Sequence, residues 1–188
     1  SAVMMKSKTP LKTVFHYGYF LVATVIISLM QSVVFGQLPT TFQKVDLVSG
    51  LKNSVNFEFA PDGRIFIIDR YGQILIYDPA TQTTVSAGFM DVFHDMEEGL
   101  LALVFDPQFS TNNYVYVHYS HPTLPANRVS RFHMNGNQID LASETVMLEW
   151  ANDRNGYYHA AGDMDFDAQG NLYVAIGDNT NHTPYSPL

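Results

Sequence analysis

The sequence contains no cysteine, and only 10 of its 188 residues are lysine or arginine. Without cysteine the chain has no disulfide, no thiolate metal site, no C-x-x-C-H haem attachment and no lipid-anchored lipoprotein start. Its 18 acidic residues give a formal net charge of −8. Like charge repels phosphate groups, so this composition argues against a nucleic acid or an anionic membrane as a partner.

Charged residues of both signs are sparse, whereas aromatic residues are plentiful. Charged residues make up 15% of the chain, and aromatic residues make up 13%, with 13 Phe, 11 Tyr and 1 Trp. Such a chain can fill a sizeable core, which argues against wholesale disorder, and its length suggests one ordinary domain. No stretch beyond the N-terminal segment shows sustained helical periodicity, so we predict an all-β fold.

Residues 1–36 have the three-part plan of a secretory signal peptide. Three lysines and no acid precede an apolar run over residues 19–30, and modest or small residues end the segment at Gly36. The run is short for a membrane span of about 20 residues, so we predict cleavage before Gln37. The protein is then secreted or periplasmic and has no stable membrane anchor. An uncleaved N-terminal anchor is the alternative, and residues 1–3 are interpreted as extra residues upstream of the start.

From residue 55 to residue 188 the pattern is short apolar strands punctuated by turns, after a lead-in segment over residues 37–54. Turn signals such as Pro61-Asp62-Gly63 and Gln169-Gly170 separate the strands. The expected strands cover residues 55–60, 64–69, 73–78, 84–92, 100–105, 114–120, 127–134, 145–150, 162–166 and 172–176.

A repeat organises these strands into cycles. FEFAPDGRIFII, LVFDPQFSTNNYVYVHY and MDFDAQGNLYVAI share a Phe, then turn residues, then an aromatic flanked by branched apolar residues. The anchoring residues are Phe59, Phe105 and Phe166, at spacings of 46 and 61. Four strands per cycle at such a period are typical of β-propeller blades, and a β-sandwich with repeated hairpins is the alternative. The chain supplies about two and a half blades, so we expect it to be the N-terminal fragment of a longer propeller.

One histidine has a candidate partner within its own hairpin. Nineteen positions separate His159 from Asp178, and the expected hairpin between them can bring its two ends together. A His oriented by an Asp is the usual arrangement for a general base near neutral pH. We therefore predict His159 and Asp178 as catalytic residues.

Other acidic and imidazole side chains carry weaker signals. Five acids between Asp91 and Asp106 lie close in sequence, but their spacing fits no EF-hand loop, so no metal site is predicted within this segment. A single glutamate just before the strand over residues 100–105 is, taken alone, interpreted as part of a solvated acidic loop. The remaining histidines have no partner visible in the sequence and are interpreted as surface or packed imidazoles: His94, His118, His121, His133 and His182.

Several consecutive motifs resemble those of one enzyme family. FAPDGRIFIIDRYGQI, EEGLLALVFDPQFSTNNYVYVHYS, NRVSRF and YHAAGDMDFDAQGNLYVAIGDN occur in the order found in the quinoprotein aldose dehydrogenases, the soluble glucose dehydrogenase and sorbosone dehydrogenase-like proteins. The resemblance covers nearly all of residues 48–181. It implies a six-bladed β-propeller that binds pyrroloquinoline quinone (PQQ), with calcium bridging cofactor and protein. Ligands for both groups are expected chiefly in later blades.

The resemblance also assigns roles to residues of this chain. It implies that His159 is the general base, that Asp178 is its partner, and that Glu97 lies near quinone and sugar. Gly162 and Asn179 complete the implied substrate- and cofactor-binding set. Ala102 stands where the family usually has glycine, and we expect it beside the pocket. The implied reaction is oxidation of an aldose at its anomeric carbon, with an external electron acceptor.

Two other functions fit the same fold. A secreted propeller can serve as a non-catalytic carbohydrate- or protein-binding module, which has no need of a base held by a carboxylate. A calcium-dependent lactonase-like propeller needs carboxylates and an Asn around its axis, for which Glu97, Asp178 and Asn179 are the candidates.

Overall fold

The computed structural model describes residues 2–7, 39, 41–152, 154, 159–160 and 162–177. It divides into two compact units, Ser1–Ser49 and Gly50–Leu188. In the first unit, β1 (Ala2–Ser7) pairs antiparallel with β2 (Phe42–Val48), which lies in the lead-in segment. The apolar run of the expected signal peptide lies outside the described residues, so that peptide stays a prediction. Among the described residues, no helix is both long and apolar enough to cross a membrane.

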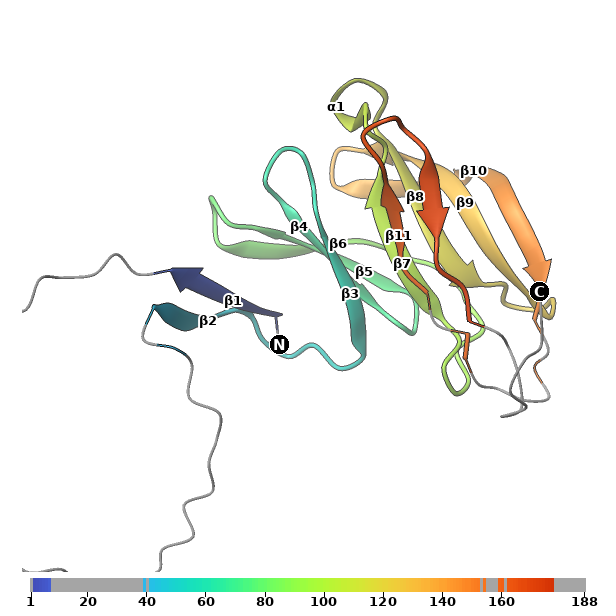
Figure 1. Cartoon of the computed structure of the whole chain (residues 1–188), viewed down its shortest axis with the longest axis horizontal. Helices are drawn as coiled ribbons and strands as arrows, with labels where there is room; N and C mark the ends of the chain where they lie inside the picture. The colour runs from blue at the N-terminus through green and yellow to red at the C-terminus, as the bar shows by residue number, and fades with distance from the viewer. Residues whose placement is uncertain are drawn as a thin grey trace, which may run out of the picture. The chain divides into compact units, whose positions relative to one another are not determined.

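The described part of the second unit contains two four-stranded antiparallel sheets and a two-stranded hairpin (Figure 1). Blade 1 has the order β3 (Ser54–Phe59), β4 (Ile65–Asp69), β5 (Gln73–Asp78) and β6 (Thr83–Phe89). Blade 2 consists of β7 (Leu100–Phe105), β8 (Tyr114–Ser120), β9 (Ala126–Asn135) and β10 (Gln138–Ala151). The blade 3 hairpin pairs β11 (Met164–Phe166) with β12 (Leu172–Val174).

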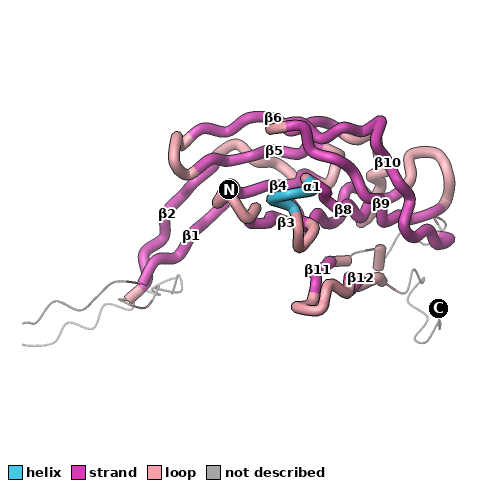
Figure 2. Tube along the Cα trace, turned by 90° about the horizontal axis from the view of Figure 1, so that it is seen from above, coloured by secondary structure: helices cyan, strands magenta, loops and turns pink. Residues whose placement is uncertain are grey.

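The first strands of consecutive blades lie side by side. β3 contacts β7, and β7 contacts β11. Figure 1 draws β11 beside β7, and Figure 2 shows the β11–β12 hairpin on one side of blade 2. Successive antiparallel sheets with neighbouring first strands form the architecture of a β-propeller, which confirms the predicted fold.

The sequence repeat corresponds to a structural one. Phe59, Phe105 and Phe166 are each the last residue of the first strand of a blade. A short turn follows each of them, and side-chain oxygens hold the turn backbone. The Asp167 carboxylate, for example, accepts the backbone N–H groups of Gln169 and Asn171 at 2.9 and 2.8 Å.

Two apolar layers join the blades. The layer between blades 1 and 2 includes Phe66 and Phe105, whose rings meet edge to face at 4.9 Å. The layer between blade 2 and the blade 3 hairpin contains Val104, Val129 and Met164. Every residue of β7 is buried, because both faces of blade 2 are covered. Removal of this apolar surface from water is the main force that stacks the blades.

The structure departs from the expected strands in blade 2. Residues 145–150 are part of the longer β10, whose pairing with β9 is interrupted between Asp140 and Thr145. The Ser143 hydroxyl holds this bulge: it accepts the His133 N–H at 2.8 Å and donates to the Asp140 carbonyl at 2.6 Å. A single helical turn, α1 (Phe109–Asn112), also stands where only a turn was expected. Asn113, in the left-handed conformation, ends it.

Candidate active site

A pocket of about 410 Å³ lies where the three blades meet. Its lining comes from β3, the β4–β5 turn, the β6–β7 loop, β7 and the start of the blade 3 segment. The lining residues are Val55, Arg70, Met96, Glu97, Leu101 and Gly162. The pocket therefore combines an apolar surface with one cationic and one anionic side chain.

Glu97 and His159 meet across 62 positions of sequence. The Glu97 Oε2 atom accepts the backbone N–H of His159 at 2.6 Å. Both residues are exposed, and His159 adopts φ 62°, a left-handed conformation that is uncommon for a non-glycine residue. Such conformations cluster at functional sites, where the surrounding structure holds them in place. Three predicted site residues thus come to one region from two segments: Glu97 from the β6–β7 loop, and His159 and Gly162 from the chain before β11.

The blade 3 hairpin brings its two ends together. The Ala175 N–H donates to the Asp163 carbonyl at 2.8 Å. A Cβ at Gly162 would lie 2.0 Å from the Ala175 carbonyl oxygen, and a Cβ at Gly177 only 1.4 Å from that of His159. No side chain fits at these distances, so both positions require glycine for this close approach. Asp178 and Asn179 lie outside the described residues, and their roles stay predictions.

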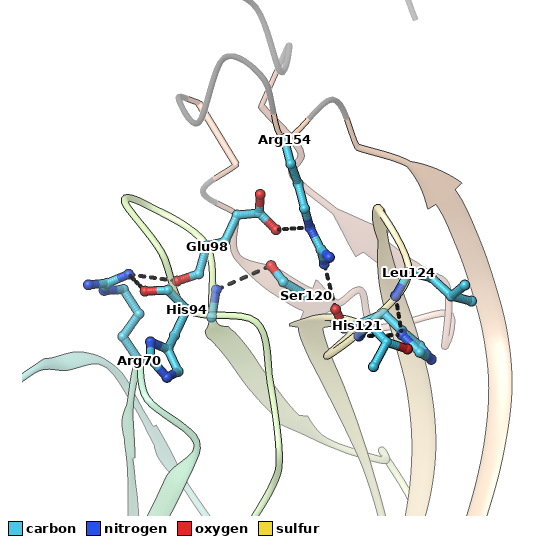
Figure 3. Close-up of polar contacts among 9 residues, drawn as sticks. Arg70, His94, Glu98, Ser120, His121, Leu124 and Arg154 are labelled. Atoms are coloured by element: carbon cyan, nitrogen blue, oxygen red, sulfur yellow. Dashed lines mark hydrogen bonds and ion pairs between the residues drawn. The ribbon is translucent and has the colours of Figure 1, made fainter.

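The loop that carries Glu97 is fixed by Arg70 (Figure 3). One guanidinium nitrogen of Arg70 donates to the carbonyl oxygens of His94 and Glu98, at 2.7 Å each. The Leu100 N–H donates to the Arg70 carbonyl at 2.8 Å, which ties the start of β7 to blade 1. Sequence reasoning did not single out Arg70, because its partners are backbone groups of a distant loop.

Glu98, directly after Glu97, is buried with a relative exposure of 1%. Burial raises the pKa of its carboxyl, and the nearby charge of Arg154 opposes that rise. The sequence alone reads a single glutamate at this entrance as part of a solvated acidic loop, which is wrong for Glu98. Two adjacent carboxylates before a buried strand were the available signal, since one of them must point inward as the chain enters the sheet.

The sequence left His118 as either a surface or a packed imidazole, and the structure shows a packed one. It is fully buried, and its ring centroid lies 5.1 Å from that of Trp150. A Cβ at Gly162 would lie 2.9 Å from its ring. Burial lowers the pKa of His118 to about 4, so the ring is neutral at physiological pH. Ala102, paired with His118 across β7 and β8, is also fully buried. It belongs to the apolar layer between blade 2 and the blade 3 hairpin, next in the chain to Leu101, which lines the pocket.

A second pocket, of about 190 Å³, lies over the outer part of blade 2. Two of its charged lining residues are engaged with other side chains: Glu144 accepts hydrogen bonds from Tyr119 and Ser130, and Arg128 forms an ion pair with Glu149. None of the predicted site residues lines it. We therefore place the candidate active site at the larger pocket. Within the described ranges, no group of three or more His, Cys, Asp or Glu side chains lies close enough together to hold a metal ion.

Comparison with known proteins identifies the family. The family model described as Glucose / Sorbosone dehydrogenase matches residues 51–186. The chain belongs to the glucose/sorbosone dehydrogenase family. An uncharacterized protein of Synechocystis sp. is 31% identical over 150 residues, which cover 73% of this chain and 35% of that protein. The human Hedgehog-interacting protein is 29% identical over 155 residues, covering 71% of this chain and 22% of that protein.

Solved structures of glucose/sorbosone dehydrogenase relatives share the fold. A putative oxidoreductase (glucose dehydrogenase) from Thermus thermophilus has a TM-score of 0.64 and 28% identity. The PQQ-bound aldose sugar dehydrogenase of Streptomyces coelicolor has a TM-score of 0.61 and 20% identity. In each case the alignment covers 71% of this chain and 40% of the other. The chain thus spans well under half the length of these relatives.

Proposed function

We propose that this chain supplies part of the active site of an exported, PQQ-dependent sugar dehydrogenase that oxidises an aldose at its anomeric carbon. The observation that carries the proposal is the contact between Glu97 and the His159 backbone at 2.6 Å, beside the pocket where three blades meet. Family membership supports the general class of oxidoreductase.

The pocket residues fit a planar, anionic quinone. A volume of about 410 Å³ lies within the range of about 300–1,000 Å³ usual for small-molecule sites. Val55 and Leu101 offer apolar surface, and Arg70 offers a positive charge to a carboxylate. The other blades of the propeller would supply the remaining contacts to the quinone and the calcium ligands.

Each residue then has a defined task. His159 takes the proton of the anomeric hydroxyl while a hydride leaves the same carbon, and the sugar becomes a lactone. Asp178 fixes the imidazole tautomer and stabilises the imidazolium that forms. Glu97 holds the His159 backbone with one oxygen and offers the other to a sugar hydroxyl. PQQ, when bound, supplies the hydride acceptor. An external electron acceptor completes the turnover.

A non-catalytic binding propeller is the second candidate. The match to the Hedgehog-interacting protein favours it, because that relative is named for an interaction with another protein. A calcium-dependent lactonase-like propeller would share the fold but would need neither a quinone nor an electron acceptor.

One experiment separates these functions. The protein, expressed with its complete propeller, is incubated with PQQ and calcium, and dye reduction is followed with a panel of aldoses. The dehydrogenase proposal requires turnover that depends on both PQQ and sugar and stops when PQQ is omitted. Sugar binding by calorimetry without any dye reduction would instead support a binding module. Hydrolysis of a lactone without PQQ would support the lactonase.

A further inference from the structure

A largely buried ion pair connects the residue that follows Glu97 to the segment that precedes His159. The Arg154 Nε atom donates to the Glu98 Oε2 atom at 3.3 Å. The side chains of Glu98 and Arg154 are only 1% and 16% exposed. The pair joins the residue next to Glu97 to a residue five positions before His159. Two links, one buried and one exposed, therefore connect the same two segments of chain.

Arg154 is held on several sides (Figure 3). Its terminal nitrogen donates to the His121 carbonyl, in the loop between β8 and β9. Its guanidinium lies 3.8 Å from the centre of the Phe93 ring, in the loop between β6 and β7. A guanidinium with an ion pair, a carbonyl acceptor and an aromatic face is fixed in both position and orientation. Arg154 therefore joins its own segment to the β6–β7 loop, which carries Glu97, and to the β8–β9 loop.

Glu98 is fixed through both its backbone and its side chain. Its carbonyl accepts a hydrogen bond from Arg70, and its N–H donates to the Asp95 carbonyl at 3.0 Å. Glu98 is drawn inward by Arg154, and its preceding neighbour Glu97 lies exposed on the pocket side. Because the two residues are adjacent, anchoring the buried Glu98 carboxylate also fixes the direction in which the Glu97 side chain leaves the backbone.

We propose that Glu98 and Arg154 are positioning residues, which hold the Glu97 carboxylate in register with the His159 backbone. The inference rests on the proposed function for its catalytic consequence, but its structural part holds for any function of the site. Neither residue lines the pocket. Both act through Glu97, which does line it, and through its contact with the His159 backbone.

Amide hydrogen exchange tests the structural part. The reporter is the His159 N–H, which Glu97→Ala exposes directly. We expect Arg154→Met to speed exchange of this amide about tenfold, as Glu97→Ala does, because the carboxylate loses its fixed position. The matched control is Arg128→Met, which removes an ion pair with Glu149 from the same blade. In this control the His159 amide should exchange at the wild-type rate.

Two further variants keep the test decisive if Arg154→Met does not fold. Arg154→Lys keeps the charge but loses the planar fork, so the His159 amide should exchange at an intermediate rate. The double variant Glu98→Gln with Arg154→Met leaves no unpaired buried charge and should exchange as fast as Glu97→Ala. Wild-type exchange in either of these folded variants would overturn the proposal. So would an unchanged rate in Glu97→Ala, because the contact would then protect nothing.

Steady-state kinetics test the catalytic part in the PQQ-loaded protein with its complete propeller. We expect kcat to fall about 100-fold in Arg154→Met, the loss typical of a misplaced catalytic group, with a much smaller change in KM. Arg154→Lys should recover part of kcat. Faster amide exchange with unaltered kcat would refute the catalytic consequence. If the wild-type protein has no dehydrogenase activity, the proposed function fails, and the exchange experiment alone decides whether the pair positions Glu97.

Discussion

His118 should make the folded protein sensitive to acid. The ring is fully buried beside Trp150, and neither of its nitrogens has a hydrogen-bond partner among the described residues. Burial lowers its pKa from 6.5 to about 4. The unfolded chain therefore binds this proton more readily than the folded chain. The contribution of His118 to stability is complete above pH 6.5 and is lost as the pH falls towards 4.

The size of the effect follows from the two pKa values. Each pH unit between them corresponds to about 1.4 kcal/mol of unfolding free energy. The loss should be about 2 kcal/mol at pH 5 and about 3 kcal/mol once the pH lies below 4. His118→Phe keeps a ring against Trp150 but cannot take up a proton. The difference in unfolding free energy between wild type and this variant should change by these amounts between pH 7 and pH 4.

The chain carries its own probe for this experiment. Trp150 is its single tryptophan, and its ring centroid lies 5.1 Å from that of His118. Protonation of the imidazole should change the Trp150 fluorescence of the folded protein with a midpoint near pH 4, and His118→Phe should abolish that change. Val117→Ala, a buried control on the same strand, should lower stability equally at every pH. A fluorescence midpoint near 6.5 in the folded protein would show instead that the ring is in contact with water.

Three further outcomes are expected. Gly162→Ala should lower the unfolding free energy by about 1–3 kcal/mol, because its Cβ would lie 2.0 Å from the Ala175 carbonyl oxygen, and an unchanged urea midpoint would contradict this. The exported protein should begin within a few residues of Gln37 by N-terminal sequencing, whereas recovery of the full chain in the cytosol would exclude a signal peptide. The 188-residue chain alone should self-associate through β3, where Phe57 and Phe59 are 56% and 62% exposed. Phe57→Ser should raise its monomer fraction in analytical ultracentrifugation, and no change would exclude this face.

The strands were predictable because each is bounded by strong local signals. Alternating apolar residues and turns such as Pro61-Asp62-Gly63 define the strands of blade 1, and the Phe repeat defines where each blade begins. The first half of β10 was not predicted, because residues 138–144 lack a strand pattern. Pairing with β9 and the Ser143 hydrogen bonds hold them in place instead.

The site was predictable only in part. The position of Glu97 came from the family resemblance, since no spacing in the sequence places it beside His159. The pair of Glu98 with Arg154 spans 56 positions and depends on the exact course of two loops. Sequence patterns report local periodicity, so they could not distinguish the buried Glu98 from its exposed neighbour.

The most direct test of the central claim is turnover per bound PQQ in the complete propeller that carries His159→Ala. We predict a fall of about 10²–10⁴-fold with quinone binding much less affected, the range expected for loss of a general base. Asp178→Asn should also slow turnover while the fold stays intact. His133→Ala, which removes an imidazole from β9, is the control and should leave turnover unchanged. Unaltered turnover per bound PQQ in His159→Ala would exclude His159 as the general base.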